Sequence, residues 1–205
     1  MRISTSTLLI TGLTLALSAC VSTSLLEHWK DPGYAGPALH KVLVVSIQQD
    51  QGRRRLWEDA MVGAFAKRGI QAEASYQVFP DQPPAPSQLT AVATRDGFDG
   101  VAATHFVGAS RRTYIEPYAG WGWGWGCCAR PWGWGPYAGP GFVESDVRAD
   151  FQTDVYTVDA TGGKLVWSGV TRSLDPGSTK AVTDDISHVL VPQLVKEGIL
   201  TGSHS

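Results

Sequence analysis

Residues 143–159, VESDVRADFQTDVYTVD, carry the pattern that most restricts the fold. Every second residue from Val147 to Val155 is apolar or small, and the residues between them are Asp, Arg or Gln. Because successive side chains of a strand point to opposite faces, this pattern predicts a half-exposed antiparallel strand. Ala160-Thr161-Gly162-Gly163 then predicts a turn, and KLVWSGVTR (164–172) predicts the second strand of a hairpin.

Upstream of this hairpin, strand patterns alternate with helix patterns. The run KVLVVSI (41–47) predicts a buried strand. Residues 53–70 predict a helix with Trp57, Met61 and Phe65 on one stripe and Gly69 just past its end. The remaining expected elements are a short edge strand at 25–29, a strand at 72–79, a helix at 87–97 capped by Ser87, and a buried strand at 100–109.

The last expected element is a helix at 178–199, in which Pro192 should introduce a kink or a break. The predicted order is therefore β-α-β-α-β-[Gly/Trp insert]-β-β-α. This order predicts an α/β (α+β) fold, in which a single mixed β-sheet is flanked by helices.

Four of these segments together resemble a known family. KVLVVSI, RRRLWEDAMVGAFAKRGI, ASY and DVYTVDATGGKLVWSGVTR resemble envelope lipoproteins of the domain of unknown function 4136 family, over residues 40–200. The layout is also similar to that of other periplasmic α/β modules, such as the amino-terminal domain of TolB. The resemblance implies binding of partner proteins, and it carries over no catalytic residues.

Residues 1–19 predict a signal peptide, because their apolar run at 8–17 is too short to cross a bilayer. The run ends in Leu17-Ser18-Ala19-Cys20, which resembles the lipobox of bacterial lipoproteins. The resemblance implies that Cys20 is acylated, with palmitate among its chains, and becomes the first residue of the mature chain. Since Val21 follows, rather than Asp, it also implies the periplasmic face of the outer membrane. The alternative is an ordinary signal peptide with a chance cysteine.

The expected domain organisation follows from these patterns. Residues 1–19 are a lipoprotein signal peptide, and residues 20–40 are a lipidated tether. Residues 41–200 are one α/β periplasmic domain, interrupted by a low-complexity Trp/Gly insert at 118–142.

The insert contains YAGWGWGWGCCARPWGWGPYAG (118–139), which holds five of the eight tryptophans. One interpretation is a codon-biased loop between two strands with no role of its own. The other is an interaction loop whose indole rings contact a membrane interface, a glycan or a partner. The candidate contact residues are Trp121, Trp123, Trp125, Trp132 and Trp134.

Cys127 and Cys128 are adjacent in this tract. Their Cα atoms would lie about 3.8 Å apart across a trans peptide, closer than the usual disulfide separation of about 4.4–6.8 Å. We therefore rank inert or adventitiously oxidised thiols first, a strained vicinal disulfide second, and a soft-metal site third.

Composition and motifs narrow the classes of function. The chain has 17 basic and 19 acidic residues without a basic stripe, so we expect no nucleic-acid binding. It contains no motif of a catalytic nucleophile, phosphate loop or metal site, so we expect neither an enzyme nor a cofactor. His105 is interpreted as a core histidine, and Asp146, Asp150 and Asp154 as a solvated strand face.

The sequence thus predicts a non-enzymatic lipoprotein, held on the membrane by its acyl chains. Its expected role is in envelope assembly or integrity, through contacts with the membrane, with envelope proteins or with peptidoglycan. The alternative is a ligand-binding module whose aromatic loop binds a glycan or another apolar-faced ligand.

Overall fold

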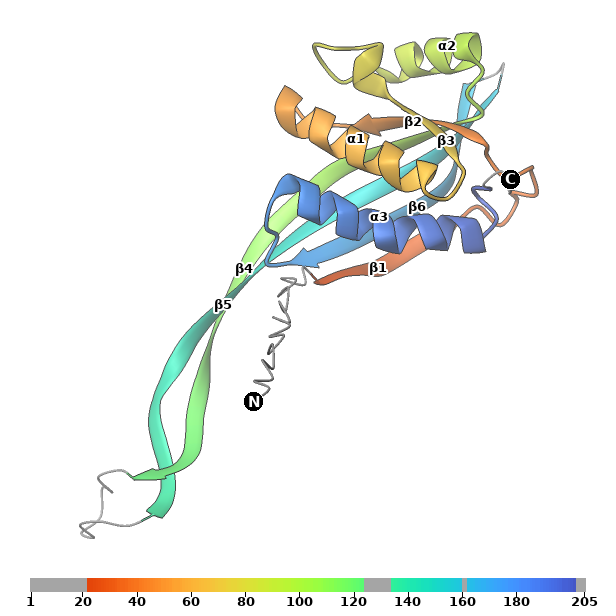
Figure 1. Ribbon diagram of the computed structural model, residues 1–205. Helices are drawn as coiled ribbons and strands as arrows, with labels where there is room; N and C mark the ends of the chain where they lie inside the picture. Colours follow the sequence, from red (N-terminus) through yellow and green to blue (C-terminus); the bar gives the residue numbers. More distant parts are fainter. Residues whose placement is uncertain (1–21, 124–133, 160–161, 202–205) are drawn as a thin grey trace, which may run out of the picture.

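The computed structural model of the chain describes residues 22–123, 134–159 and 162–201, and for Ser22, 114–123, 134–144 and Asp159 it describes the backbone alone. Its centre is one mixed sheet with the strand order β1-β6-β5-β4-β2-β3 (Figure 1). Strand β2 pairs in parallel with β3 and β4, whereas the other neighbours are antiparallel. The strands are β1 (Ser22–Lys30), β2 (Lys41–Ser46), β3 (Gln71–Ala74), β4 (Gly100–Trp123), β5 (Trp134–Asp159) and β6 (Gly162–Leu174).

Helices cover both faces of this sheet. Helices α1 (Gln51–Ala66) and α3 (Thr179–Lys196) pack on the face to which Val42 and Val44 point. Helix α2 (Pro86–Asp96) packs on the other face, against Leu43 and Val45. The fold class predicted from the sequence, a single mixed sheet flanked by helices, is therefore confirmed.

The predicted stripe of α1 is also confirmed, since Trp57, Met61 and Phe65 are all buried. The helix ends in a complete Schellman motif around Gly69, whose φ is 71°. The Gly69 N–H donates to the Ala66 carbonyl at 3.0 Å, and the Ile70 N–H donates to the Phe65 carbonyl at 3.1 Å.

Two predicted boundaries are wrong. Strand β3 stops at Ala74, and a 3-10 turn (Ser75–Gln77) replaces the rest of the expected strand. The turn forms because the Tyr76 N–H donates to a carboxylate of α1 instead of to a strand. Helix α2 begins at Pro86 with Ala85 as its N-cap, so Ser87 lies in the first turn and does not cap it.

The amino-terminal strand is longer than predicted, and α3 is not broken. Strand β1 pairs with β6 from Ser22, opposite Leu174, to Lys30, opposite Trp167, so part of the expected tether is the edge of the sheet. Helix α3 runs through Pro192 as one helix, capped at its start by Ser178, whose hydroxyl accepts from the Ala181 N–H. Packing of Ile186, Leu190 and Leu194 on the sheet compensates for the hydrogen bond that proline cannot donate.

Packing within β6 accounts for the Trp and the Gly of its sequence Leu-Val-Trp-Ser-Gly (165–169). The indole ring of Trp167 is fully buried and lies across Gly169. A Cβ at position 169 would come within 2.2 Å of the ring, so only glycine fits there. The Trp167 Nε1–H donates to Glu197 Oε2 at 3.1 Å, which ties β6 to the end of α3.

Candidate interaction site

Strands β4 and β5 continue far beyond the rest of the sheet. They pair from Gly100, opposite Thr157, to Trp123, opposite Trp134. Strand β6 follows β5 only as far as Arg148, opposite Leu174. Beyond that row β4 and β5 have only each other, and they project as a two-stranded ribbon (Figure 1). We call β4 from Arg111 and β5 up to Val147 the ribbon, and the rest of the described chain the body.

The ribbon corrects the expectation that the Trp/Gly tract is a loop. Residues 118–123 pair with 134–139, residues 140–142 continue strand β5, and the segment 124–133 lies outside the described residues. Glycine is depleted in strands, which favours a loop when the tract is considered alone. Strand formation here follows from pairing, because the alternating hairpin strands extend into the tract with one shift of register between Glu116 and Tyr118.

The register determines which tryptophans share a face. Trp123 is opposite Trp134, and Trp121 is opposite Pro136. Directly opposite residues belong to one face, and so do residues two apart. Trp121, Trp123 and Trp134 therefore lie on one face, whereas Tyr118 and Tyr137 lie on the other with the glycines. Of the other candidate residues, Trp125, Trp132, Cys20, Cys127 and Cys128 lie outside the described residues.

Hydrogen bonds of charged side chains stabilise the junction between the ribbon and the body. Arg172 donates from Nε to Asp150 Oδ1 at 2.8 Å and from Nη2 to Oδ2 at 2.6 Å. This bidentate hydrogen bonding from Arg172 lowers the pKa of the Asp150 carboxyl from its ordinary value. Asp175, with φ 46°, accepts from the Val147 N–H at 2.9 Å and donates its own N–H to the Val147 carbonyl at 2.7 Å. These bonds end β6 and fix the register of β5.

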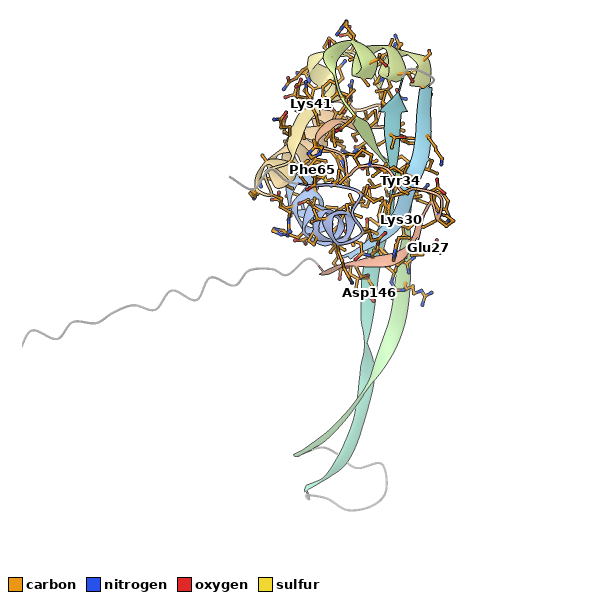
Figure 2. The ribbon with its side chains drawn as sticks, turned by 90° about the vertical axis from the view of Figure 1, so that its right-hand side faces the viewer. Glu27, Lys30, Tyr34, Lys41, Phe65 and Asp146 are labelled. Carbon is orange, nitrogen blue, oxygen red and sulfur yellow. The ribbon has the colours of Figure 1, made fainter. Side chains whose placement is uncertain are left out.

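The aspartates of this strand face do not converge on a shared site. Asp150 binds Arg172, and Asp154 accepts from the Ser168 hydroxyl at 2.6 Å. Asp146 forms an ion pair with Arg148 at 3.6 Å and lies where the ribbon leaves the body (Figure 2). The face is therefore a row of local pairs, as expected of a partly solvated strand.

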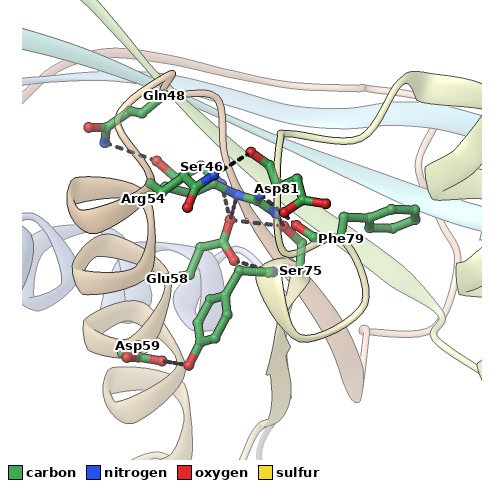
Figure 3. Close-up of polar contacts among 10 residues, drawn as sticks. Ser46, Gln48, Arg54, Glu58, Asp59, Ser75, Phe79 and Asp81 are labelled. Atoms are coloured by element: carbon green, nitrogen blue, oxygen red, sulfur yellow. Dashed lines mark hydrogen bonds and ion pairs between the residues drawn. The ribbon is translucent and has the colours of Figure 1, made fainter.

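A buried ion pair in the body is a feature that the sequence patterns did not predict. Arg54 and Glu58 lie one turn apart in α1 with almost no exposure, and Arg54 Nε donates to Glu58 Oε1 at 3.1 Å. Glu58 also accepts from the Ser46 N–H at 2.9 Å, the Ser75 hydroxyl at 2.8 Å and the Tyr76 N–H at 2.8 Å (Figure 3).

The guanidinium of Arg54 is equally well satisfied. It donates to the Phe79 carbonyl at 2.7 Å and to the Ser75 hydroxyl at 2.9 Å. Because every oxygen of Glu58 and every nitrogen of Arg54 has a partner, this cluster joins α1, the end of β2 and the 75–79 segment. Its one sequence signal is the i, i+4 spacing of Arg and Glu on a helix that is otherwise apolar at its buried positions.

Two of the grooves on the described body lie beside its helices and beside its amino-terminal strand. One, of about 300 Å³, lies between α1 and α3 and is lined by Ala64, Lys67, Arg68, Ser187, His188 and Val191. The other, of about 230 Å³, crosses β1 and β6 beside Trp29 and Gln152. His105, in β4, is half-buried and lines neither groove.

The described residues hold neither a candidate metal site nor a membrane-spanning helix. They contain no group of three His, Cys, Asp or Glu side chains that could hold a metal ion. None of the helices among them is both long and apolar enough to span a membrane.

Known proteins resemble the chain only in structure. No family model and no curated protein matches its sequence. The PelC dodecamer from Paraburkholderia phytofirmans is 11% identical, with a TM-score of 0.45, and the match covers 88% of this chain and 99% of PelC. Lipoprotein GNA1162 from Neisseria meningitidis is 12% identical, with a TM-score of 0.38, and the match covers 77% of this chain and 99% of GNA1162.

A PDZ domain protein from Parabacteroides distasonis is similar over 85% of this chain and 37% of its own, at 7% identity and a TM-score of 0.33. At sequence identities this low, each match describes similarity of fold and nothing more. The fold class itself rests on the sheet and helices described above.

Proposed function

We propose that this chain is a lipid-anchored protein of the bacterial envelope that acts by contact and not by catalysis. In this proposal Cys20 carries the acyl chains, the domain lies on the periplasmic face of the outer membrane, and the ribbon makes the contact. The role is in envelope assembly or integrity.

The ribbon is the observation that carries the contact role. An isolated two-stranded hairpin is at best marginally stable in water, so a ribbon that leaves its sheet needs something to pack against. Tryptophan supplies large apolar area with one N–H donor, which suits contact surfaces. The anchor is supported by Leu17-Ser18-Ala19-Cys20, which closes an apolar run of signal-peptide length.

The anchor is tested with the full chain in a Gram-negative host. Labelled palmitate should enter the wild-type protein, and the protein should fractionate with the outer membrane. The Cys20→Ala variant should take up no label and remain as the unprocessed precursor. Cys127→Ser/Cys128→Ser is the matched control, since it removes the other two cysteines and should be labelled normally. Label in the Cys20→Ala protein would contradict the anchor.

The contact role is tested by crosslinking in intact envelopes. Wild type should yield a defined crosslinked species that is lost in Trp121→Ser/Trp123→Ser/Trp134→Ser. Trp29→Ser is the matched control, because this ring is 46% exposed but belongs to β1. Equal crosslinking of all three proteins would contradict a role for the ribbon. Retention on purified peptidoglycan that depends on the three rings would favour the glycan-binding alternative.

A further inference from the structure

The amino end of the described chain and the ribbon leave the body at the same edge. Ser22, the first residue of β1, is opposite Leu174, Leu174 is opposite Arg148, and Arg148 is opposite Ser110. This row crosses all four strands of the antiparallel part of the sheet. Beyond it only β4 and β5 continue, and Figure 1 shows β1 beginning at the edge from which they project.

The length of chain before β1 determines how far an anchor at Cys20 can lie from this edge. Two Cα–Cα steps separate Cys20 from Ser22, so the distance is at most about 8 Å. An acylated Cys20 therefore brings the membrane surface close to the edge from which the ribbon projects. The opposite end of β1, at Lys30, is eight residues away and hydrogen-bonds the backbone carbonyl of Glu197 in the body.

The ribbon is long enough to reach and follow that surface. The residues from Arg111 to Trp123 extend roughly 40 Å at a strand rise of about 3.3 Å per residue. Its charge changes along its length. The part next to the body carries Arg111, Arg112, Glu116, Glu144 and Asp146, whereas 117–123 and 134–143 contain no charged residue. The register shift between Glu116 and Tyr118 lies at this change, and such irregularities bend strands.

The uncharged part has one face suited to a lipid interface. The register places Trp121, Trp123 and Trp134 together, with Pro136 opposite Trp121. Tryptophan is enriched at membrane–water interfaces. The outer edges of a two-stranded ribbon leave backbone N–H and C=O groups unpaired, and these groups cannot enter the hydrocarbon without a large cost. In an interfacial position, headgroups and water would reach the unpaired edges, and the face of the ribbon that holds the three tryptophan positions would meet the acyl boundary.

We infer that the ribbon beyond Tyr118 lies on the lipid surface that holds the Cys20 anchor, with the Trp121, Trp123 and Trp134 face toward the lipid. This inference rests on the proposed anchor and adds a second attachment at the same edge of the domain. The protein is then held at two points, and its sheet is oriented relative to the membrane.

The test uses the full acylated chain, reconstituted into vesicles of phosphatidylethanolamine and phosphatidylglycerol. Tryptophan emission is compared with and without phosphatidylcholine brominated near the carboxyl end of its acyl chain. Bromine should quench wild type, and Trp121→Phe/Trp123→Phe/Trp134→Phe should lose at least about half of that quenching. Phenylalanine removes the reporter and keeps an apolar ring. Trp29→Phe is the control and should be quenched at least as strongly as wild type, since Trp29 lies on β1 seven residues from the anchored edge.

Mass spectrometry of the same samples separates this inference from the proposed function. Acyl chains on Cys20 together with equal emission in both kinds of vesicle would overturn the lipid contact and leave the anchor intact. Quenching that is unchanged in the triple variant would also overturn it. An unacylated Cys20 would overturn the anchor, and the two-point attachment with it.

Discussion

The body and the ribbon contain the same two strands, yet different interactions hold them. In the body, β4 and β5 lie between other strands, and Val155 and Ala102 pack against side chains of α1 and α3. In the ribbon, each strand has one neighbour and no helix. Pairing alone therefore extends a strand well past its core, but the core determines how much stability each residue contributes. We expect substitutions to have large effects in the body and small effects on folding in the ribbon.

The largest loss of stability is expected for Glu58→Ala. The change leaves Arg54 buried without its counter-charge and removes the acceptor of three further hydrogen bonds. Breaking a buried pair from one side costs about 3–5 kcal/mol, and the extra orphaned donors favour the upper end. Urea unfolding of the purified protein measures it. Asp59→Ala, at the exposed neighbouring position, should differ little from wild type, and similar losses in both variants would contradict the role of the cluster.

Trp57→Ala should cost nearly as much, about 3–5 kcal/mol, because a large buried ring leaves a cavity. Trp57 is 1% exposed and stacks on Phe151 with ring centroids 4.9 Å apart. Thermal unfolding is the measurement. Leu56→Ala, on the same helix at a position that is 51% exposed, is the control and should shift the melting temperature little. An unchanged melting temperature in Trp57→Ala would contradict the burial of this ring in the core.

Gly169→Ala should destabilise by about 1–3 kcal/mol, as overpacking does, since the added methyl group collides with the Trp167 ring. Gly63→Ala is a matched change in α1, where an added Cβ meets nothing within 4 Å. It should stabilise the protein by about 0.5–1 kcal/mol, because alanine favours a helix. The free energy of unfolding of each variant, measured by chemical denaturation, should fall for Gly169→Ala and rise for Gly63→Ala.

A smaller effect is expected at the edge between body and ribbon, and it depends on pH. The folded-state pKa of Asp150 is lowered by its hydrogen bonds from Arg172. Its contribution is therefore fully present above the unfolded pKa of about 3.9 and is lost as the pH falls through the lower folded pKa. Between about pH 5 and pH 2, wild type should lose more stability than Asp150→Asn. Parallel pH profiles for the two proteins would show that the pair contributes nothing to folding.

The smallest effect on stability is expected in the ribbon. Replacing residues 118–141 with a short Gly/Ser loop should change the free energy of unfolding by less than about 1 kcal/mol, since loop closure depends only weakly on length. Calorimetry of the full chain with and without the replacement measures this. Loss of the folded state would show that the distal ribbon belongs to the core, and the distinction between the two regions would fail.

Local patterns predicted the parts of the fold that local forces determine. The stripe of Trp57, Met61 and Phe65, the Schellman end at Gly69 and the β5–β6 hairpin all depend on residues close in sequence. The wrong boundaries arise from contacts with residues far along the chain. Strand β3 ends early because the Tyr76 N–H donates to Glu58 of helix α1. The residues next to Tyr76 in the sequence contain no signal for this contact.

The same distinction applies to the candidate site. The Trp/Gly tract was identified from sequence, but its strand structure was not, because glycine-rich composition favours a loop. The face shared by Trp121, Trp123 and Trp134 depends on a cross-strand register that only the pairing of β4 with β5 defines. Strand β1 was underestimated for a related reason, since its partner β6 lies about 150 residues away.

The direction in which β1 enters the sheet has a mechanical consequence. A pull on the amino end of the chain acts along the strand axis, because Ser22 lies at the edge and the strand runs inward from it. The hydrogen bonds between β1 and β6 are perpendicular to the strands, so such a pull shears many of them together and does not open them one after another. An edge strand that would peel easily from the side therefore resists tension along its own length. With the proposed anchor at Cys20, tension from the membrane would act on the domain in this stronger direction.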